Sequence, residues 1–311
     1  MNVAELIDAV LAGERRAVAR AISLVEDGAG ELEELSAGVY PNTGRADTIG
    51  LTGAPGVGKS TLAGEIVRVA RSMDIPIAVL AVDPTSPFTG GALLGDRVRM
   101  QEHATDPGVF IRSMATRGHL GGMALAAPEA VRILDAAGYA RVIIETVGVG
   151  QSEVDVAAQA DTTVVVLAPG WGDAVQMAKA GILEVADLFV VNKAERDGAA
   201  EAVRDLKQML QMGPARDWDP PVLTTTATER EGVQAAWDAI EEHRSHLERS
   251  GTLAARRRER LLREVEALAA ERFRTLAAGA LRADPDLADD LAERRTDPYR
   301  AAAILAERAS R

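Results

Sequence analysis

The sequence contains no cysteine, few aromatic residues and no excess of basic residues. The missing cysteines exclude disulfides, thiolate metal sites and cysteine nucleophiles. Aromatic residues make up only 3% of the chain, so the core must be built from Ala, Val, Leu and Ile. The formal net charge of −12 argues against a nucleic-acid partner, because such partners normally require a basic face.

Two further absences concern membranes and export. No apolar run approaches the roughly 20 residues that span a bilayer. The N-terminus carries an acidic residue early, at Glu5, and has no signal-peptide pattern. We therefore expect a cytoplasmic protein. With 311 residues, 47% of them hydrophobic and 26% charged, the chain has room for one large globular domain with extensions.

The sequence does contain a phosphate-binding motif, placed between a short apolar run and a helical pattern. It matches G-x-x-x-x-G-K-[ST] in the strand–loop–helix context that this motif requires. Its residues are Gly53, Ala54, Pro55, Gly56, Val57, Gly58, Lys59, Ser60 and Thr61. The glycines let backbone N–H groups turn inward, and the following helix adds the positive end of its dipole. We expect Lys59 to reach the outer phosphates of a nucleotide and the Ser60 hydroxyl to bind Mg²⁺.

Apolar runs alternate with helical patterns after residue 47, which predicts an α/β fold. Runs rich in Val, Ile and Leu predict buried strands at residues 75–82, 109–111, 142–144, 163–167, 188–191 and 222–223. Amphipathic segments lie between them, for example at residues 126–137 and 199–209. This alternation indicates a mostly parallel sheet covered by helices on both faces. Ligands of such folds bind at the carboxyl ends of the strands. We predict a P-loop NTPase domain over residues 45–250.

Helical extensions are predicted on both sides of this domain. Residues 1–44 form an N-terminal extension, helical over 3–35 with breaks near Gly13, Gly28 and Gly30, that packs on the main domain. Residues 251–311 form a C-terminal arm with two predicted helix starts, in which Asp284 and Asp297 are N-caps followed by proline at the first helical position. The arm carries an apolar stripe in a charged background: Leu262, Val265, Ala269, Phe273, Leu276 and Ala280. We favour burial of this stripe against a second subunit over burial against the parent domain.

Several acidic residues are candidates for the metal and water site. Glu145 ends the apolar run at 142–144, where the acid of a phosphate-loop protein approaches Mg²⁺ directly or through water. Gly148 follows three residues later and can place its N–H beside the terminal phosphate. A loop rich in Gly, Pro and hydroxyl residues after the second strand carries Asp83 and, further on, Asp96. We interpret it as a first switch in which both acids position Mg²⁺ or the attacking water.

The segment Asn192-Lys193-Ala194-Glu195 resembles the guanine-selecting motif N-K-x-D of GTPases. A carboxylate at its last position accepts hydrogen bonds from the N1–H and the 2-amino group of guanine, donors that adenine does not present together. Glu195 replaces the usual Asp and adds a methylene, and we expect the guanine preference to survive. Thr226, Ala227 and Thr228 follow a predicted strand, in the place of the loop that contacts the base.

Four further segments, together with the phosphate loop, resemble one family. They read AVDPTSPFTGG (81–91), LGDRVRM (94–100), RSMATRGHLGG (112–122) and ETVGVGQSE (145–153). The chain thereby resembles the MeaB/ArgK (methylmalonic aciduria type A protein-like) family of P-loop GTPases over nearly its whole length. The resemblance implies a SIMIBI-class GTPase fold and a homodimer that uses Mg²⁺ and GTP. It further implies a chaperone that gates adenosylcobalamin loading of a cobalamin-dependent acyl-CoA mutase, typically methylmalonyl-CoA mutase, and protects that enzyme. Cobalamin would then be met only through the partner.

The resemblance also assigns roles to individual residues. It places Asp83, Asp96 and Glu145 in the metal and water site. The segment GWGDAVQMAK (170–179) matches a third switch that couples nucleotide state to the mutase, where the family usually reads G-D-E-L-Q-G-I-K. Asp173, Gln176 and Lys179 are kept in this segment, whereas Ala174 and Met177 depart from the family pattern.

Hydrolysis by the isolated chain is predicted to be slow. Phosphoryl transfer from GTP depends on positioning and charge neutralisation, which Lys59 and Mg²⁺ would supply. The place of a Ras-like glutamine directly after Gly148 is taken by Val149, and Gln151 stands two positions further on. We expect a partner, or reordering of Arg97, Arg117 or Lys179, to raise the rate.

Three alternative functions compete with this interpretation. A metallochaperone GTPase would need Cys and His clusters, but cysteine is absent and the chain has only four histidines. We expect His103 and His119 to be polar loop residues, and His243 and His246 to be solvated on a charged helix. A small-molecule kinase is disfavoured by the Asn192-Lys193 motif. A non-catalytic binding module would bind the nucleotide and never turn it over.

Overall fold

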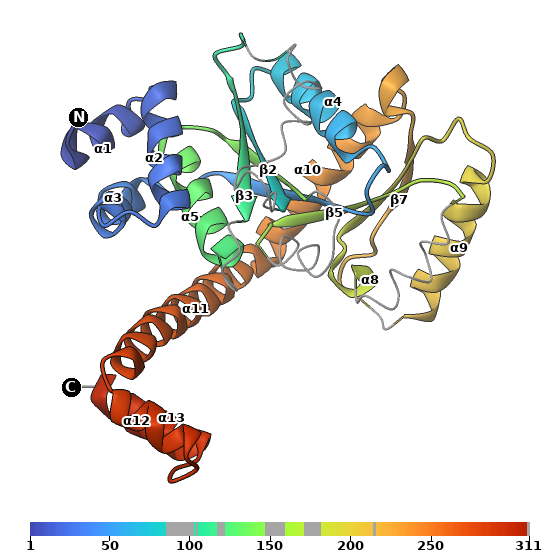
Figure 1. Cartoon of the computed structure of the whole chain (residues 1–311). Helices are drawn as coiled ribbons and strands as arrows, with labels where there is room; N and C mark the ends of the chain where they lie inside the picture. The colour runs from blue at the N-terminus through green and yellow to red at the C-terminus, as the bar shows by residue number, and fades with distance from the viewer. Residues whose placement is uncertain are drawn as a thin grey trace. The chain divides into compact units, whose positions relative to one another are not determined.

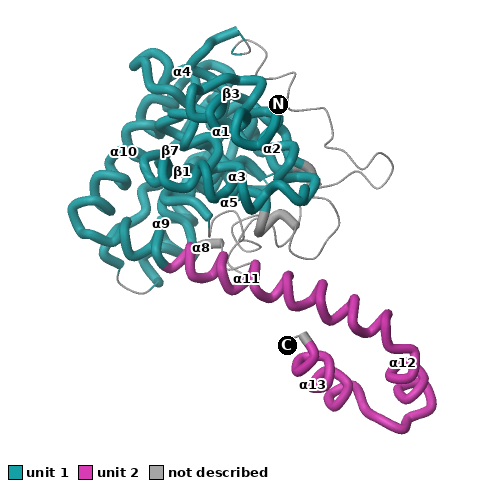
Figure 2. The backbone as a smooth tube through the Cα atoms, turned by 90° about the vertical axis from the view of Figure 1, so that its left-hand side faces the viewer, with its two compact units in different colours: residues 1–258 teal, residues 259–311 magenta. Residues whose placement is uncertain are grey.

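The chain is described here from a computed structural model. The structure describes residues 1–84, 103, 105–116, 122–146, 159–170, 182–213 and 216–309. They form two compact units, residues 1–258 and residues 259–311 (Figure 2). The first unit holds the phosphate loop and the guanine motif. The second consists of helices.

The first unit is built around a parallel β-sheet (Figure 1). Within the described residues the sheet has seven strands in the order β3-β2-β4-β1-β5-β6-β7, and every neighbouring pair is parallel. The strands are β1 (Asp47–Thr52), β2 (Ile77–Pro84), β3 (Val109–Thr116), β4 (Arg141–Thr146), β5 (Thr162–Leu167), β6 (Leu188–Asn192) and β7 (Val222–Thr225). The predicted α/β fold with a parallel sheet is confirmed. Because β1 is central, the phosphate loop that follows it lies at the middle of the sheet's carboxyl edge.

Helices cover both faces of this sheet. The helices of the α/β core are α4 (Lys59–Ser72), α5 (Gly122–Ala136), α8 (Ile182–Val185), α9 (Ala199–Met212) and α10 (Val233–Ser250), with a 3₁₀ turn, η3 (Ala227–Glu229). Ile49 and Leu51 of β1 pack on the face of α4 and α10. Val142 and Ile144 of β4 pack on the opposite face, with α5. This two-residue alternation of buried apolar side chains explains why the strands read as continuous hydrophobic runs.

Three short helices form the N-terminal extension, α1 (Val3–Leu11), α2 (Arg15–Asp27) and α3 (Leu32–Val39), followed by the 3₁₀ turn η1 (Tyr40–Asn42). Val18, Ile22 and Val25 of α2 are buried and share a hydrophobic cluster with residues of α5. Gly28 ends α2 with a φ of 60°, a left-handed conformation that glycine adopts without steric cost. The extension therefore belongs to the same compact unit as the sheet.

An arginine from the first turns of α11 (Thr252–Arg282) is fixed at the amino-terminal edge of the sheet. Arg257 Nη2 lies 2.7 Å from Asp161 Oδ2 and 3.1 Å from Asp47 Oδ1, and its Nε lies 3.1 Å from Asp161 Oδ1. The guanidinium also donates to the carbonyl oxygens of Gly44 and Ala46, at 2.9 Å each. One side chain thus joins the residues that precede β1 and β5.

The buried charges at the amino-terminal edge of the sheet shift one another's pKa values. Burial raises the pKa of the Asp47 carboxyl above its ordinary value, although the positive charges of Arg141, Arg244 and Arg257 oppose the shift. Burial would lower the pKa of Arg257, but its hydrogen bond to Asp161 and the negative charges around it outweigh burial and raise that pKa. The arginines therefore offset the cost of burying these carboxylates.

The expectation that His243 is solvated is wrong. This residue of α10 is fully buried. Its Nδ1 lies 2.9 Å from the Thr162 hydroxyl, and its Nε2 lies 3.2 Å from Asp187 Oδ1. The imidazole ring also packs against Trp218, with 5.0 Å between the ring centroids. The ring therefore fills a polar site at the edge of β5 and β6.

The second unit contains the end of α11 together with α12 (Pro285–Ala292) and α13 (Pro298–Ala309). Both predicted helix starts are confirmed. The Asp284 side chain accepts a hydrogen bond from the backbone N–H of Leu287 at 3.0 Å. The Asp297 side chain accepts one from that of Tyr299 at 2.9 Å. Across the described ranges, we find no helix with the length and apolarity needed to cross a lipid bilayer.

Candidate functional site

The phosphate loop joins β1 to α4 and requires glycine at two positions. Gly53 has a φ of 139°, and a Cβ atom there would lie 2.1 Å from the carbonyl oxygen of Val166 on β5. Gly58 has a φ of 98°, and its Cβ would lie 2.3 Å from Asn192 Nδ2. Backbone atoms and a buried amide cannot yield by such distances. The two glycines therefore let the loop lie against β5 and the guanine motif.

Lys59 lies inside this loop and is almost fully buried. Its ammonium group donates hydrogen bonds to the carbonyl oxygens of Gly53 at 2.6 Å and Ala54 at 3.1 Å. A buried ammonium needs such acceptors because desolvation of its charge is costly. The lysine therefore holds a positive charge where the loop would surround a phosphate chain, as its motif predicts.

Ser60 and Glu145 meet at the carboxyl edge of the sheet. The hydroxyl of Ser60, in the first turn of α4, donates a hydrogen bond to Glu145 Oε1 at 2.6 Å. Glu145 lies on β4, which pairs directly with β1, and both side chains are buried. A hydroxyl and a carboxylate are the hard oxygen ligands that Mg²⁺ takes in nucleotide sites. This pair therefore fits the metal that the sequence predicts.

The other predicted switch residues are only partly within the described structure. Asp83 lies on β2, but its side chain is outside the described part, and Asp96 is outside it altogether. Gly148, near the end of β4 in sequence, also lies outside the described residues. The same holds for the third-switch residues Asp173, Gln176 and Lys179, and for Val149, Gln151, Arg97, Arg117 and His119. His103 is described and buried, with its Nε2 3.2 Å from the carbonyl oxygen of Gly64 in α4.

The guanine motif begins at the end of β6, where the buried side chain of Asn192 connects two loops. Its Nδ2 donates to the carbonyl oxygen of Val57 in the phosphate loop at 2.9 Å. Its Oδ1 accepts from the Thr225 hydroxyl at 3.0 Å and from the backbone N–H of Ala227 at 3.2 Å. One amide thus fixes the phosphate loop to the loop after β7. Val57 and Asn192, which this amide brings together, are 135 residues apart in the sequence.

Lys193 continues this connection. It has a φ of 59°, which is unusual for a residue with a Cβ. Its ammonium group donates to the carbonyl oxygen of Gly56 at 2.5 Å. Asn192 and Lys193 thus hold two successive carbonyl groups of the phosphate loop. Backbone carbonyls fixed in this way leave the N–H groups of the loop available for an anion.

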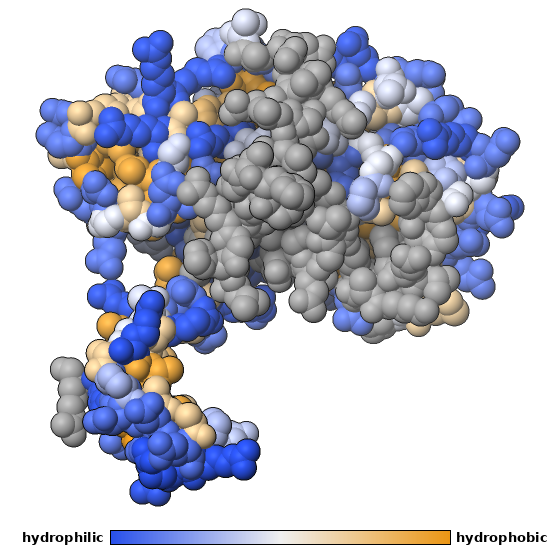
Figure 3. Space-filling model, viewed as in Figure 1, coloured by the Kyte–Doolittle hydropathy of each residue, from blue (hydrophilic) through white to orange (hydrophobic). Residues whose placement is uncertain are grey.

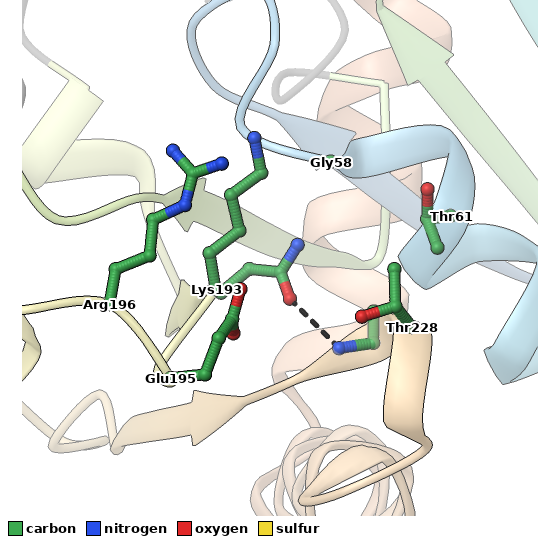
Figure 4. Close-up of a pocket in the computed structure, with 8 residues that line it drawn as sticks. Gly58, Thr61, Lys193, Glu195, Arg196 and Thr228 are labelled. Carbon is green, nitrogen blue, oxygen red and sulfur yellow. Dashed lines mark hydrogen bonds between the residues drawn. The ribbon is translucent and has the colours of Figure 1, made fainter.

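A pocket lies between these segments (Figure 4). Its lining residues are Gly58, Thr61, Asn192, Lys193, Glu195, Arg196, Ala227 and Thr228. They come from the phosphate loop and α4, the guanine motif, and the loop after β7. All except Arg196 belong to the residues that the sequence predicts for nucleotide binding. Thr226 is buried beside them. Arg196 carried no sequence signal beyond its place next to Glu195.

Comparison with known proteins assigns the fold to a family. A family model described as "Methylmalonyl Co-A mutase-associated GTPase MeaB" matches residues 18–281. The chain belongs to the MeaB family of GTPases. The match spans the phosphate loop, the guanine motif, the whole sheet and most of α11. The resemblance predicted from the sequence motifs is therefore confirmed.

Individual relatives agree with this MeaB assignment. A putative GTPase of Pyrococcus horikoshii is 47% identical over 308 residues, covering 98% of this chain and 97% of the relative. The mitochondrial methylmalonic aciduria type A homolog of Caenorhabditis elegans is 36% identical over 282 residues, covering 84% of this chain and 70% of the relative. The crystal structure of a protein named LAO/AO transport system kinase has a TM-score of 0.74 and 29% identity. The comparison covers 100% of this chain and 99% of that protein.

Membership of the MeaB family and the P-loop fold establish GTP hydrolysis as the activity of this class of protein, and the chain is a GTP hydrolase. Guanine nucleotide is accordingly its ligand, and GTPases of this family usually use Mg²⁺. The arrangement of β1, β4 and β6 serves this chemistry, because their carboxyl ends bring the phosphate loop, Glu145 and Asn192 to one edge of the sheet.

Proposed function

We propose that this chain is a cytoplasmic chaperone of a cobalamin-dependent acyl-CoA mutase, with methylmalonyl-CoA mutase as the expected client. In this proposal GTP binding and hydrolysis gate the loading of adenosylcobalamin onto the mutase and protect the mutase from inactivation. The observation that carries the proposal is the match of residues 18–281 to a family described as methylmalonyl-CoA mutase-associated. Cobalamin would be contacted through the mutase and not by this chain alone.

The proposed nucleotide site uses the phosphate loop, residues 53–61, for the phosphates. Lys59 would release the two loop carbonyls that it now contacts and turn its ammonium toward the phosphate oxygens. Ser60 and Glu145 would hold Mg²⁺, which neutralises phosphate charge when bound. Asp83 and Asp96 complete the proposed metal and water site. Support comes from the short contact between Ser60 and Glu145, which already places two suitable oxygen ligands together.

The proposed base site is the pocket beside Asn192. Glu195 would accept hydrogen bonds from the N1–H and 2-amino groups of guanine, and Thr226, Ala227 and Thr228 would border the base. Gly148 would approach the terminal phosphate. The connection of Asn192 to both Val57 and Ala227 supports this assignment, because it ties the base side of the pocket to the phosphate side. Bound nucleotide would then stabilise both loops at once.

Coupling to the mutase is assigned to the segment that contains Asp173, Gln176 and Lys179. We infer that hydrolysis is slow in the isolated chain and faster with the mutase, because no glutamine directly follows Gly148. The chain would act as a timer. Its GTP and GDP states would differ in their affinity for the mutase, and hydrolysis would convert one state into the other.

The proposal also covers the organisation of the chain, with residues 1–44 as an extension, 45–250 as the GTPase domain and 251–311 as a dimerisation arm. Large apolar side chains of α11 are exposed in the second unit: Leu261, Leu262, Val265, Leu268, Phe273, Leu276 and Leu281. Figure 3 shows apolar atoms on the surface of this arm. An exposed stripe of this kind on a long helix requires a partner, and we assign it to a second copy of this chain.

The test uses the full chain and purified methylmalonyl-CoA mutase from the same organism. Binding of the chain to the mutase is measured with GDP, with a non-hydrolysable GTP analogue and without nucleotide. The loss of mutase activity during turnover with adenosylcobalamin is followed in parallel. We expect the affinity for the mutase to depend on the nucleotide, and the chaperone with GTP to slow inactivation. A Lys59→Ala chain, which cannot neutralise the phosphates, should lose the nucleotide dependence.

Two results would contradict the whole proposal, and a third would contradict its gating part. One is the absence of mutase binding in all three nucleotide states together with unchanged inactivation. The other is transfer of the terminal phosphate of labelled GTP to a small molecule instead of to water, which would indicate the kinase alternative. An affinity for the mutase that is the same in all three nucleotide states would contradict the gating role.

A further inference from the structure

Arg196 borders the pocket proposed for the base, yet the nucleotide-binding motifs give it no role. It follows Glu195 in the turn after β6, and its backbone N–H donates to the carbonyl oxygen of Lys193 at 3.0 Å. This hydrogen bond closes a tight turn. It brings Lys193, Glu195 and Arg196 to the same pocket, where Figure 4 shows their side chains.

The three charged side chains of this turn differ in what they contact. The ammonium group of Lys193 is held by the carbonyl oxygen of Gly56, so its methylene stem has a fixed position in the pocket wall. Arg196 and Glu195 are exposed. In the described part of the chain neither side chain forms a hydrogen bond or ion pair. Arg196 is therefore able to rearrange around a ligand without breaking a hydrogen bond or ion pair to any described residue.

Among the described residues, the pocket has no aromatic ring on which a base could stack. Its lining residues supply backbone, hydroxyl, amide and carboxylate groups, and no aromatic ring is among them. The guanidinium group of Arg196 is a planar cation in this lining, and guanidinium groups stack on aromatic faces. A nucleobase in contact with the Lys193 stem presents a second face, which the Arg196 guanidinium could cover.

We propose that Arg196 is a base-stacking residue that covers the face of the guanine base opposite the Lys193 stem. This inference rests on the proposed base site and deepens it. Stacking uses the π face that every base presents, so Arg196 contributes affinity without discriminating between bases. Discrimination belongs to Glu195, which reads hydrogen-bond donors at the base edge. The two neighbouring side chains thus divide affinity and selectivity between them.

The alternative role for a cation in this place is pairing with the nucleotide phosphates. The surroundings favour stacking, because the loop N–H groups and Lys59, which lies within the loop, would already serve the phosphates. Arg196 instead lies next to Glu195 and shares a pocket with Ala227 and Thr228. The two roles differ in a measurable way. Stacking requires the planar guanidinium, whereas phosphate pairing requires only a positive charge.

The experiment measures dissociation constants by calorimetry for GDP, IDP and inorganic tripolyphosphate. The chains are the wild type, Arg196→Ala, Arg196→Lys and Glu195→Gln. Arg204→Ala serves as the matched control, because Arg204 is an exposed arginine of α9. We expect Arg196→Ala to weaken the binding of GDP and of IDP by the same factor, about three- to thirty-fold. The affinity for tripolyphosphate should be unchanged. Arg196→Lys should resemble Arg196→Ala. Arg204→Ala should resemble the wild type.

Three results would overturn the inference. Unchanged GDP affinity in Arg196→Ala would show that the side chain does not contact the nucleotide. Full rescue by Arg196→Lys, or an equal loss of tripolyphosphate binding, would assign it to the phosphates. Glu195→Gln tests the underlying site separately, because the preference for GDP over IDP must fall. An unchanged preference would remove the base-site assignment itself, whatever Arg196 does.

Discussion

The Ser60 hydroxyl donates a 2.6 Å hydrogen bond to the Glu145 carboxylate, which joins the first turn of α4 to the end of β4. Both groups are buried, and the two residues lie 85 positions apart in the sequence. The contact exists because β1 and β4 are neighbours in the sheet. The protein thus holds together two oxygen-bearing side chains at the phosphate loop, both suited to bind Mg²⁺.

We predict that Ser60→Ala lowers the Mg²⁺-dependent rate of GTP hydrolysis on the order of a hundredfold or more. The change removes one proposed ligand of an ion that supplies several kcal/mol of charge stabilisation. Single-turnover hydrolysis at increasing Mg²⁺ concentration measures the effect. Ser72→Ala is the matched control, because this serine lies at the other end of α4 and its hydroxyl donates to the Val69 carbonyl. Equal rates in both variants would contradict the prediction.

Asn192→Ala is predicted to reduce both stability and nucleotide affinity. The change leaves the Val57 carbonyl, the Thr225 hydroxyl and the Ala227 N–H without their buried partner. We expect the free energy of unfolding to fall by about 1–3 kcal/mol, and GDP to bind at least about tenfold more weakly. Urea denaturation and calorimetry measure the two effects. Thr225→Val removes only one of the contacts and should lose less of both. If both variants bind GDP equally well, Asn192 does not connect the loops as described.

The sequence predicts those parts of the site whose motifs lie within a few consecutive residues. The phosphate loop and Asn192 were found because their spacing is a property of a few consecutive residues. The strands were found as apolar runs, but their ends were missed where polar residues such as Thr116, Thr146 and Thr225 continue the pairing. Those residues belong to the carboxyl edge, where strands give way to functional loops.

Contacts between distant segments were not predictable. Arg257 looked like one member of a charged helix, and its partners Asp47 and Asp161 lie 210 and 96 residues away. The charged helix likewise predicts a solvated His243, but the imidazole is buried in contact with Thr162 and Asp187. Helical periodicity shows which residues share a face. It contains no information about which strand edge that face meets.

Arg257→Met is predicted to destabilise the first unit by about 3–5 kcal/mol, because it removes one of the cations that offset the burial of Asp47 and Asp161. Asp161 would lose a two-pronged contact with the guanidinium. Urea denaturation gives the change in unfolding free energy. Hydrogen exchange of residues 252–258 reports on the first turns of α11, and we expect faster exchange there. Arg258→Met is the control, because Arg258 is exposed. An equally small effect of both changes would contradict the role given to Arg257.

Asp106 is predicted to contribute a pH-dependent part of the stability. The hydrogen bond from Arg71 Nε, at 2.9 Å, holds the pKa of the Asp106 carboxyl below its ordinary value of 3.8. A carboxyl whose pKa is lower in the folded state stabilises the fold above the ordinary pKa, and this stability is lost as pH falls through the folded pKa. We therefore expect the stability difference between wild type and Asp106→Asn to be constant above about pH 5 and to shrink below about pH 4.

Urea denaturation at several pH values tests this expectation, with Asp205→Asn as the control because Asp205 is an exposed carboxylate of α9. The stability difference between wild type and Asp205→Asn should not follow the same profile. A difference for Asp106→Asn that stays constant down to about pH 3 would show that the Arg71 contact does not favour the ionised carboxyl.

The apolar stripe of α11 predicts the oligomeric state. Val265→Glu combined with Leu276→Glu should convert a dimer into a monomer, because it places charges on exposed apolar positions of one helix face without lowering helix propensity. Ala267→Glu combined with Ala278→Glu adds the same charges on the opposite side of the helix, at 100° per residue, and should leave the dimer intact. Sedimentation equilibrium over a range of concentrations measures the mass. A wild-type chain that is monomeric throughout, or a Val265/Leu276 variant that remains dimeric, would show that this stripe does not bind a second copy.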